Sequence, residues 1–185
     1  MKRYALALIC LLASVLAGCN KEGTAFFRGT YGYTVSGTLE CRYELSSSED
    51  VKVADVKSFQ LVDEQGIMHI EPHGDATVMT MKDYTGSVQV FDVEIDGRDI
   101  TVKPHGRKVK LRMDNDIRIN DEDTGITLPD YVTVDVTVSG HGYKTGGLMV
   151  LELEYKGGTF EAGPVLTPTT YTITGSSVDC VATRE

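Results

Sequence analysis

Tryptophan is absent from this chain of 185 residues, and no apolar run is long enough to cross a bilayer comfortably. Basic residues are in deficit, because 18 Lys and Arg stand against 27 Asp and Glu. This balance argues against a nucleic-acid partner, which would need a basic face to displace phosphate counterions. The hydrophobic share of 41% and the charged share of 24% exclude a disordered, collagen-like or polytopic membrane protein. The length predicts one globular domain.

The N-terminus has the layout of a secretory signal. A short positive start precedes an almost unbroken apolar run over residues 4–16, and small residues follow. The run ends in a Leu, two small residues and a Cys, which resembles the lipobox of bacterial lipoproteins: Leu16, Ala17, Gly18 and Cys19. The resemblance implies that residues 1–18 are a signal peptide, that cleavage precedes Cys19, and that the thiol and amine of Cys19 carry lipid. Several acyl chains on one residue would anchor the protein stably in a membrane.

Residues 19–28 are predicted to be a lipidated tether, because the residues after Cys19 are polar and include glycine. No Asp follows Cys19 directly, a residue that retains some bacterial lipoproteins at the inner membrane. The resemblance therefore favours the outer membrane, in either leaflet. The folded domain is expected over residues 29–185.

Four cysteines are present, and the lipoprotein resemblance assigns two of them. Cys10 leaves with the signal peptide and Cys19 carries lipid. Cys41 and Cys180 then remain, in a compartment that permits disulfides. We predict a bond between them; the alternative is two buried free thiols.

Alternation of apolar and polar residues dominates the rest of the chain. In residues 132–139 every second residue is valine, which predicts a half-buried strand. The same alternation predicts strands over residues 31–43, 88–95, 109–113 and 148–155, with shorter ones over 100–102, 171–174 and 178–181. No helix is predicted after residue 19, and residues 51–59 fit neither period.

Glycine-containing turns separate the predicted strands. The clearest are Asp96-Gly97 and Gly157-Gly158, and another is predicted over residues 63–66. Gly37 is expected to mark a bend or bulge in a long strand. Residues 70–74 and 102–106 share Pro-His-Gly, which indicates either a duplicated hairpin or, as we favour, two similar turns.

About ten short strands joined by tight turns predict an all-β antiparallel meander that closes into a single barrel of about 8–10 strands, or alternatively a β-sandwich. The lipobox, the tether and the opening Gly29-Thr30-Tyr31 of the first strand resemble the calycin-like (lipocalin-like) β-barrel lipoproteins of Gram-negative bacteria. The Gly-x-Trp signature of classical lipocalins is missing, and Tyr31 stands where its Trp would be.

Metal-ligating residue types occur in two places. His73, His105 and His141 each precede a glycine and are predicted to be solvated in turns, although turns at one barrel end could gather them for Zn²⁺. Residues 114–125 are acidic, and Asp121 and Asp123 are candidate Ca²⁺ ligands. The EF-hand pattern fails because no acidic residue stands at its twelfth position. A solvated loop is therefore the preferred interpretation, and no cofactor is predicted.

No catalytic constellation is found in the sequence, and we predict that the protein is not an enzyme. A barrel of this size can enclose a small ligand, so the first predicted function is a membrane-anchored binding module for a small apolar molecule such as a lipid. Methionine lines adaptable apolar sites, so the candidate lining residues are Tyr31, Met79, Met81, Met113 and Met149. The alternative is a structural or adhesion module with a filled core, which contacts an envelope protein partner through its outer surface.

Overall fold

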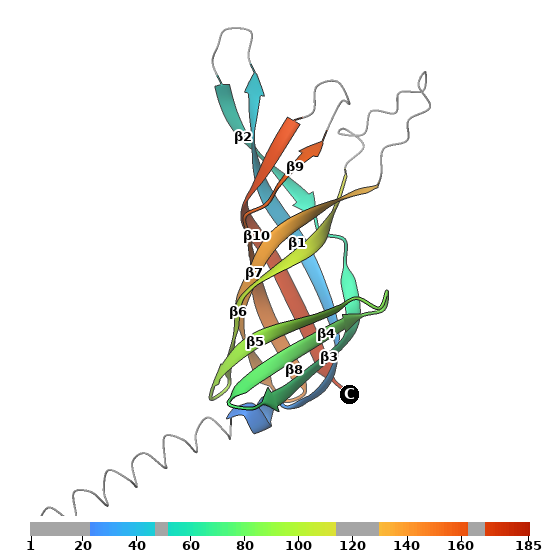
Figure 1. Ribbon diagram of the computed structural model, residues 1–185, viewed down its shortest axis with the longest axis vertical. Coiled ribbons are helices and arrows are strands. Elements are labelled where there is room, and N and C mark those ends of the chain that lie inside the picture. The colour runs from blue at the N-terminus through green and yellow to red at the C-terminus, as the bar shows by residue number, and fades with distance from the viewer. Residues whose placement is uncertain (1–22, 47–51, 114–129, 163–168) are drawn as a thin grey trace, which may run out of the picture.

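The computed structural model describes residues 23–46, 52–113, 130–162 and 169–185 (Figure 1). Most of these residues are in strands. In chain order the strands are β1 (Gly29–Ser46), β2 (Lys52–Gln60), β3 (Glu64–His73), β4 (Ala76–Asp83), β5 (Val88–Asp96), β6 (Asp99–Arg112), β7 (Tyr131–Thr145), β8 (Leu148–Lys156), β9 (Thr159–Ala162) and β10 (Thr169–Arg184).

One antiparallel sheet contains all ten strands in the order β2-β1-β3-β4-β5-β6-β7-β8-β10-β9. Strand β1 also pairs with β10, so eight of the strands close into a barrel-like ring. Strands β2 and β9 lie outside that ring and extend it at one end (Figure 1). The predicted fold class, an all-β antiparallel meander that closes on itself, is confirmed.

Gly37 lies where β1 changes its neighbour. Residues 29–35 of β1 pair with β3, and residues 38–46 pair with β2. The φ of Gly37 is 147°, and a Cβ there would lie 2.1 Å from the backbone oxygen of Ser177 on β10. The close approach of β1 and β10 therefore requires glycine at this position, whereas the register shift in β1 lies between Glu40 and Cys41.

The alternating segments place one face of each strand in the core. In β7, Val134, Val136 and Val138 are buried, whereas Thr133 and Asp135 are exposed. In β8 the buried residues are Met149, Leu151, Leu153 and Tyr155. Period-two burial is confirmed in both strands, because one face of each packs on the interior and the other meets water.

Several predicted boundaries differ from the structure. The segments around 100–102 and 109–113 belong to the single strand β6, which continues through Pro104 by a register shift between Val102 and His105. The similar segment at 70–74 does end in a hairpin turn, with Gly74 at φ 64°. The two Pro-His-Gly segments therefore differ, because one forms a turn and the other a bulge. Pro104 fits the bulge because proline has no amide hydrogen to donate to the ladder. His141 likewise lies within β7 rather than in a turn.

The structure corrects the predicted tether over residues 19–28, because part of it is helical. Residues 23–27 form a short helix that packs against one end of the ring, with the side chain of Phe27 fully buried (Figure 1). Tyr31 donates a hydrogen bond to the Phe27 carbonyl at 2.5 Å, and Lys144 donates to the Phe26 carbonyl. Tertiary contacts rather than helix propensity hold so short a helix. Within the described residues, no helix has the length and apolar character needed to span a membrane.

Candidate functional site

Strands β5 and β6 separate soon after their shared turn. They pair only from Val93–Asp96 of β5 to Asp99–Val102 of β6. Beyond that point the two strands diverge: β5 runs around the wall of the ring, and β6 continues toward the opposite end of the ring (Figure 1). The backbone ladder of the ring is therefore interrupted between residues 88–92 of β5 and residues 105–110 of β6. We call this interruption the opening; the rings of Phe91 and His105 contact each other across it, with 5.0 Å between their centroids.

A cavity of about 340 Å³ lies at this opening. We call it the lateral cavity. Residues from the β2–β3 connection, the β4–β5 turn, β5 and β6 line it: Leu61, Val62, Asp63, Glu64, Gln65, Asp83, Tyr84, Thr85, Ser87, Gln89, Arg107, Lys108, Val109 and Lys110.

An ion pair lies in the wall of the lateral cavity. Arg107 on β6 donates a hydrogen bond from Nη2 to Oε2 of Glu64 at the start of β3, and only 5% of the Arg107 side chain is exposed. Tyr33 on β1 donates to the other Glu64 oxygen at 2.8 Å. Burial, followed by the hydrogen bond to Glu64, raises the pKa of Tyr33 well above its ordinary value. Glu64 therefore joins three strands through charge-assisted hydrogen bonds.

Two other polar atoms at the lateral cavity have no partner. Arg107 Nε and Gln89 Oε1 are buried and make no hydrogen bond within the part of the chain that the structure describes. One is a donor and the other an acceptor. An unpaired buried polar atom costs about 1–3 kcal/mol, so both atoms are sites where a partner would be favourable.

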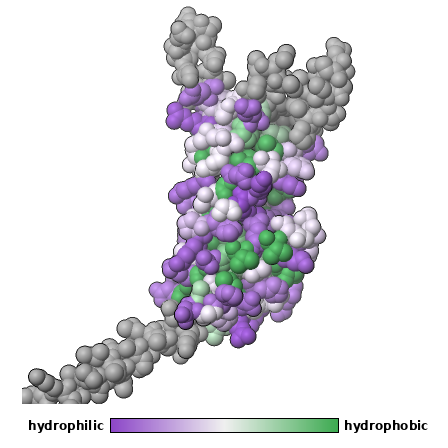
Figure 2. Space-filling model, viewed as in Figure 1, coloured by the Kyte–Doolittle hydropathy of each residue, from purple (hydrophilic) through white to green (hydrophobic). Residues whose placement is uncertain are grey.

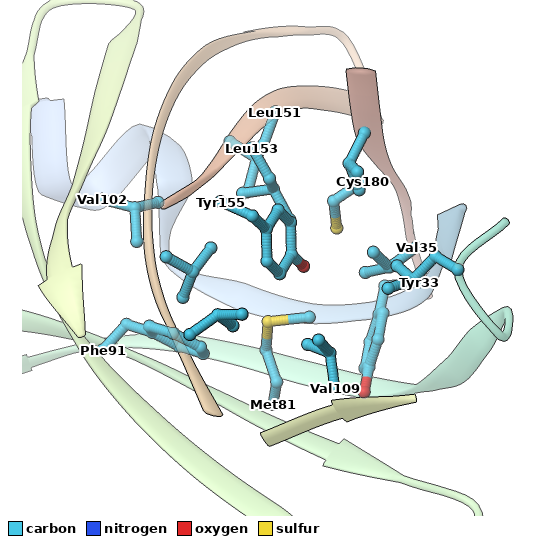
Figure 3. Packing of buried hydrophobic residues seen from close by; sticks show 14 of the residues in the cluster. Tyr33, Val35, Met81, Phe91, Val102, Val109, Leu151, Leu153, Tyr155 and Cys180 are labelled. Atoms are coloured by element: carbon cyan, nitrogen blue, oxygen red, sulfur yellow. The ribbon is translucent and has the colours of Figure 1, made fainter. Parts of the chain in front are cut away.

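Tyr155 carries the third unpartnered atom, its hydroxyl oxygen. This hydroxyl points into the interior between Cys180 and Met81 (Figure 3). Burial raises the pKa of Tyr155 to about 12, with the Arg107 charge acting in the opposite direction. Burial likewise raises the pKa of Cys180 to about 12, so neither group is ionised at neutral pH.

Valine side chains cover the outside of β5 beside the opening. Val88 is 55% exposed and Val90 is 49% exposed. Figure 2 shows apolar residues gathered over β4 and β5 on this face. Exposed apolar residues next to an unpaired strand edge form a surface suited to another strand.

Two larger hollows lie elsewhere on the outer surface. One, of about 1030 Å³, lies between the β3–β4 and β5–β6 turns and reaches Thr24 and Arg28. The other, of about 920 Å³, crosses the outer face of β6, β7, β8 and β10. Two exposed contacts border it, the Lys103–Glu94 ion pair at 2.6 Å and the contact between His141 Nε2 and Glu152 Oε2 at 3.3 Å, and exposed ion pairs contribute little free energy. Among the described residues no group of three or more His, Cys, Asp or Glu could hold a metal ion.

The predicted ligand-lining residues lie in the core. Tyr31, Met79, Met81 and Met149 are at most 2% exposed, and Met113 packs partly buried against the same core. None of these five residues lines the three hollows described above.

The predicted Cys41–Cys180 disulfide is not formed, and both cysteines are free and buried. Their strands β1 and β10 are neighbours, but Cys41 lies opposite Ile173, and Cys180 lies opposite Val35. Val35 and Cys41 are six residues apart on β1, which separates the two cysteines by about 20 Å along the strands at 3.3 Å per residue. Proximity of the strands was inferred correctly, but their register was not.

Other predicted site residues fall outside the described residues. They are the lipobox residues Leu16, Ala17, Gly18 and Cys19, and the calcium candidates Asp121 and Asp123.

Sequence reasoning missed Glu64, Gln89 and Arg107. Arg107 occupies the same parity of β6 as the buried Val109 and Leu111, so a charged residue at an inward position was the available signal. The two separate strands predicted over 100–102 and 109–113 leave Arg107 outside any strand, so its inward parity is not recognised. Phe26 and Phe27 were a comparable signal within the predicted tether, since a flexible linker rarely carries adjacent aromatic residues.

No known family model matches the chain, and no curated protein matches it either.

Proposed function

We propose that this protein is an envelope-anchored interaction module with a filled core, which binds other macromolecules through its outer surface. The observation that carries the proposal is the packing of the ring interior. Met68, Met79 and Met149 are at most 1% exposed, and Tyr31 and Tyr155 are fully buried beside them. A ligand-binding barrel would instead need an apolar space large enough for its ligand.

The hollows at the surface support the same proposal. The lateral cavity and the two larger hollows are lined by mixtures of charged, hydroxyl and apolar groups. Such lining suits contacts with a polar macromolecule better than it suits storage of a lipid.

The anchor would hold one end of the ring near the membrane. Only residues 20–22 separate Cys19 from the helix over 23–27 that packs on the ring. Three residues span at most about 11 Å when fully extended. A lipid on Cys19 would therefore keep this end of the body close to the outer-membrane surface and leave the sides of the ring accessible.

Native mass spectrometry tests the filled core. A form that starts at Asn20, secreted to the periplasm and purified without detergent, is expected to show the mass of the chain alone. Stoichiometric retention of a small apolar molecule would overturn the proposal and favour the ligand-binding alternative.

Fractionation of cells tests the anchor. Substitution Cys19→Ala is expected to move the protein out of the outer-membrane fraction, because the acylated thiol and the processing signal are both lost. A Cys19→Ala protein that stays in that fraction in the wild-type amount would remove lipidation from the proposal.

A further inference from the structure

We propose that an extended peptide segment of a partner protein docks in the opening between β5 and β6 and pairs with β5 as an additional strand. This inference rests on the proposed function, because it names one kind of partner and the place on the outer surface where it binds.

The backbone of β5 offers an unpaired edge at this place. Asp83 N donates to Ser87 O at 3.0 Å, and the β4–β5 register continues through Gln89 and Phe91. Because backbone groups of successive residues alternate in direction, the amides and carbonyls of Val88, Val90 and Asp92 face away from β4, toward β6. Pairing with β6 ends at Val93, so this edge is available to another strand.

The unpartnered side-chain atoms match the chemistry of a peptide group. Arg107 Nε needs an acceptor and Gln89 Oε1 needs a donor, and both line the lateral cavity at the base of the opening. The Arg107 side chain is 95% buried, so water has little access to it. Because solvent does not reach either atom, the side chains of Arg107 and Gln89 would turn toward a docked main chain, which supplies a carbonyl and an amide at every residue.

The outer face of the opening indicates the side chains of the partner. A strand beside β5 would place alternate residues against Val88 and Val90, which are 55% and 49% exposed. Cross-strand pairs of β-branched or aromatic residues are favourable at such positions. We therefore expect a segment with an apolar residue at every second position. This is strand addition to a sheet edge, with affinity from the main chain and specificity from alternate side chains.

The experiment uses a phage-displayed library of random heptapeptides, selected on the mature full-length protein in detergent micelles. Selected peptides are then synthesised with and without N-methyl groups at alternate residues. Their affinities are measured for the wild type and for Val90→Pro, which removes one edge amide. Val90→Thr is the matched control, because it keeps a β-branched residue and the amide.

We expect peptides that bind the wild type and Val90→Thr with similar affinity and Val90→Pro at least about tenfold more weakly. N-methylation in one of the two alternate registers should weaken binding to the wild type by a similar factor. That measurement keeps the test valid even if Val90→Pro does not fold.

Three outcomes would overturn the inference: no peptide enriched above background, peptides that bind Val90→Pro as well as the wild type, or peptides insensitive to N-methylation in both registers. A wild-type dimer that Val90→Pro dissociates in sedimentation would also overturn it, since the occupant would then be a second copy of the chain. These outcomes can be told apart from failure of the proposed function, because that function fails only if native mass spectra show a retained small apolar molecule.

Discussion

Arg107 on β6 donates a hydrogen bond to Glu64 at the start of β3, and both side chains lie largely out of solvent within an apolar ring. The two residues are 43 positions apart in the chain. The pair lies beside the gap between β5 and β6, where the backbone ladder is interrupted. It therefore links β6 to β3 through side chains, although these two strands are not neighbours in the sheet.

Substitution Arg107→Met is expected to destabilise the protein by about 3 kcal/mol, because it leaves the Glu64 carboxylate without its positive partner. Urea unfolding measures the change. The exposed pair formed by Lys103 and Glu94 provides the control, and Lys103→Met should change stability by less than about 1 kcal/mol. Equal effects of the two substitutions would show that the Arg107 pair is no more important than a surface pair.

Two buried tyrosines provide a second comparison. Tyr33→Phe removes a hydrogen bond to a carboxylate and should destabilise the protein by about 2 kcal/mol. Tyr155→Phe removes a hydroxyl that has no partner among the described residues, so stability should rise or stay within about 0.5 kcal/mol. Denaturant unfolding of both variants tests the contrast. A large loss of stability in Tyr155→Phe would indicate that its hydroxyl has a partner, such as a buried water.

Much of the fold could be predicted because burial imposes a period of two on each strand. Valines at alternate positions of β7 and apolar residues at alternate positions of β8 can be recognised in the sequence without knowing which strands lie beside them. The special role of Gly37 could also be predicted, because a glycine within an alternating strand often marks a place where two backbones approach closely.

The candidate site could not be predicted in the same way, because it depends on pairings between distant strands. Glu64 falls within the turn predicted over residues 63–66, although it begins β3, and nothing local in the sequence connects it to Arg107. The error over Cys41 and Cys180 has the same origin, because sequence indicated adjacent strands but not their register. The helix at 23–27 was missed because its stability comes from contacts such as that of Lys144 with Phe26.

The free cysteines lead to a prediction about thiol reactivity. Burial raises the pKa of Cys41 to about 11 and that of Cys180 to about 12, and the thiolate is the reactive form. A form that starts at Asn20 should therefore react slowly with a disulfide reagent at pH 8 in the native state. After denaturation without reductant, the reagent should detect two thiols per chain, those of Cys41 and Cys180. Finding no thiols in the denatured protein would restore the disulfide.

Lys144 gives a prediction about alkaline pH. Its side chain is 2% exposed, and its Nζ lies 4.5 Å from the centroid of the Phe26 ring. Burial, together with the charge of Arg184, lowers the pKa of Lys144 below its ordinary value of 10.5. Between the lowered folded-state pKa and the ordinary one, the unfolded chain binds more protons than the folded chain, so folding becomes more favourable as pH rises.

The stability difference between the wild type and Lys144→Met isolates this group, because contributions from other titrating groups largely cancel. We expect the wild type to gain stability relative to Lys144→Met as pH rises toward 10.5. Lys144→Arg is the matched control, because a guanidinium stays charged over this range and the difference should not grow. Urea unfolding at several alkaline pH values measures both differences. If the stability difference between the wild type and Lys144→Met stays flat or falls as pH rises, the prediction is wrong. The Phe26 carbonyl and ring would then stabilise the buried ammonium enough to offset its desolvation, and the helix over 23–27 would be held equally well at every pH.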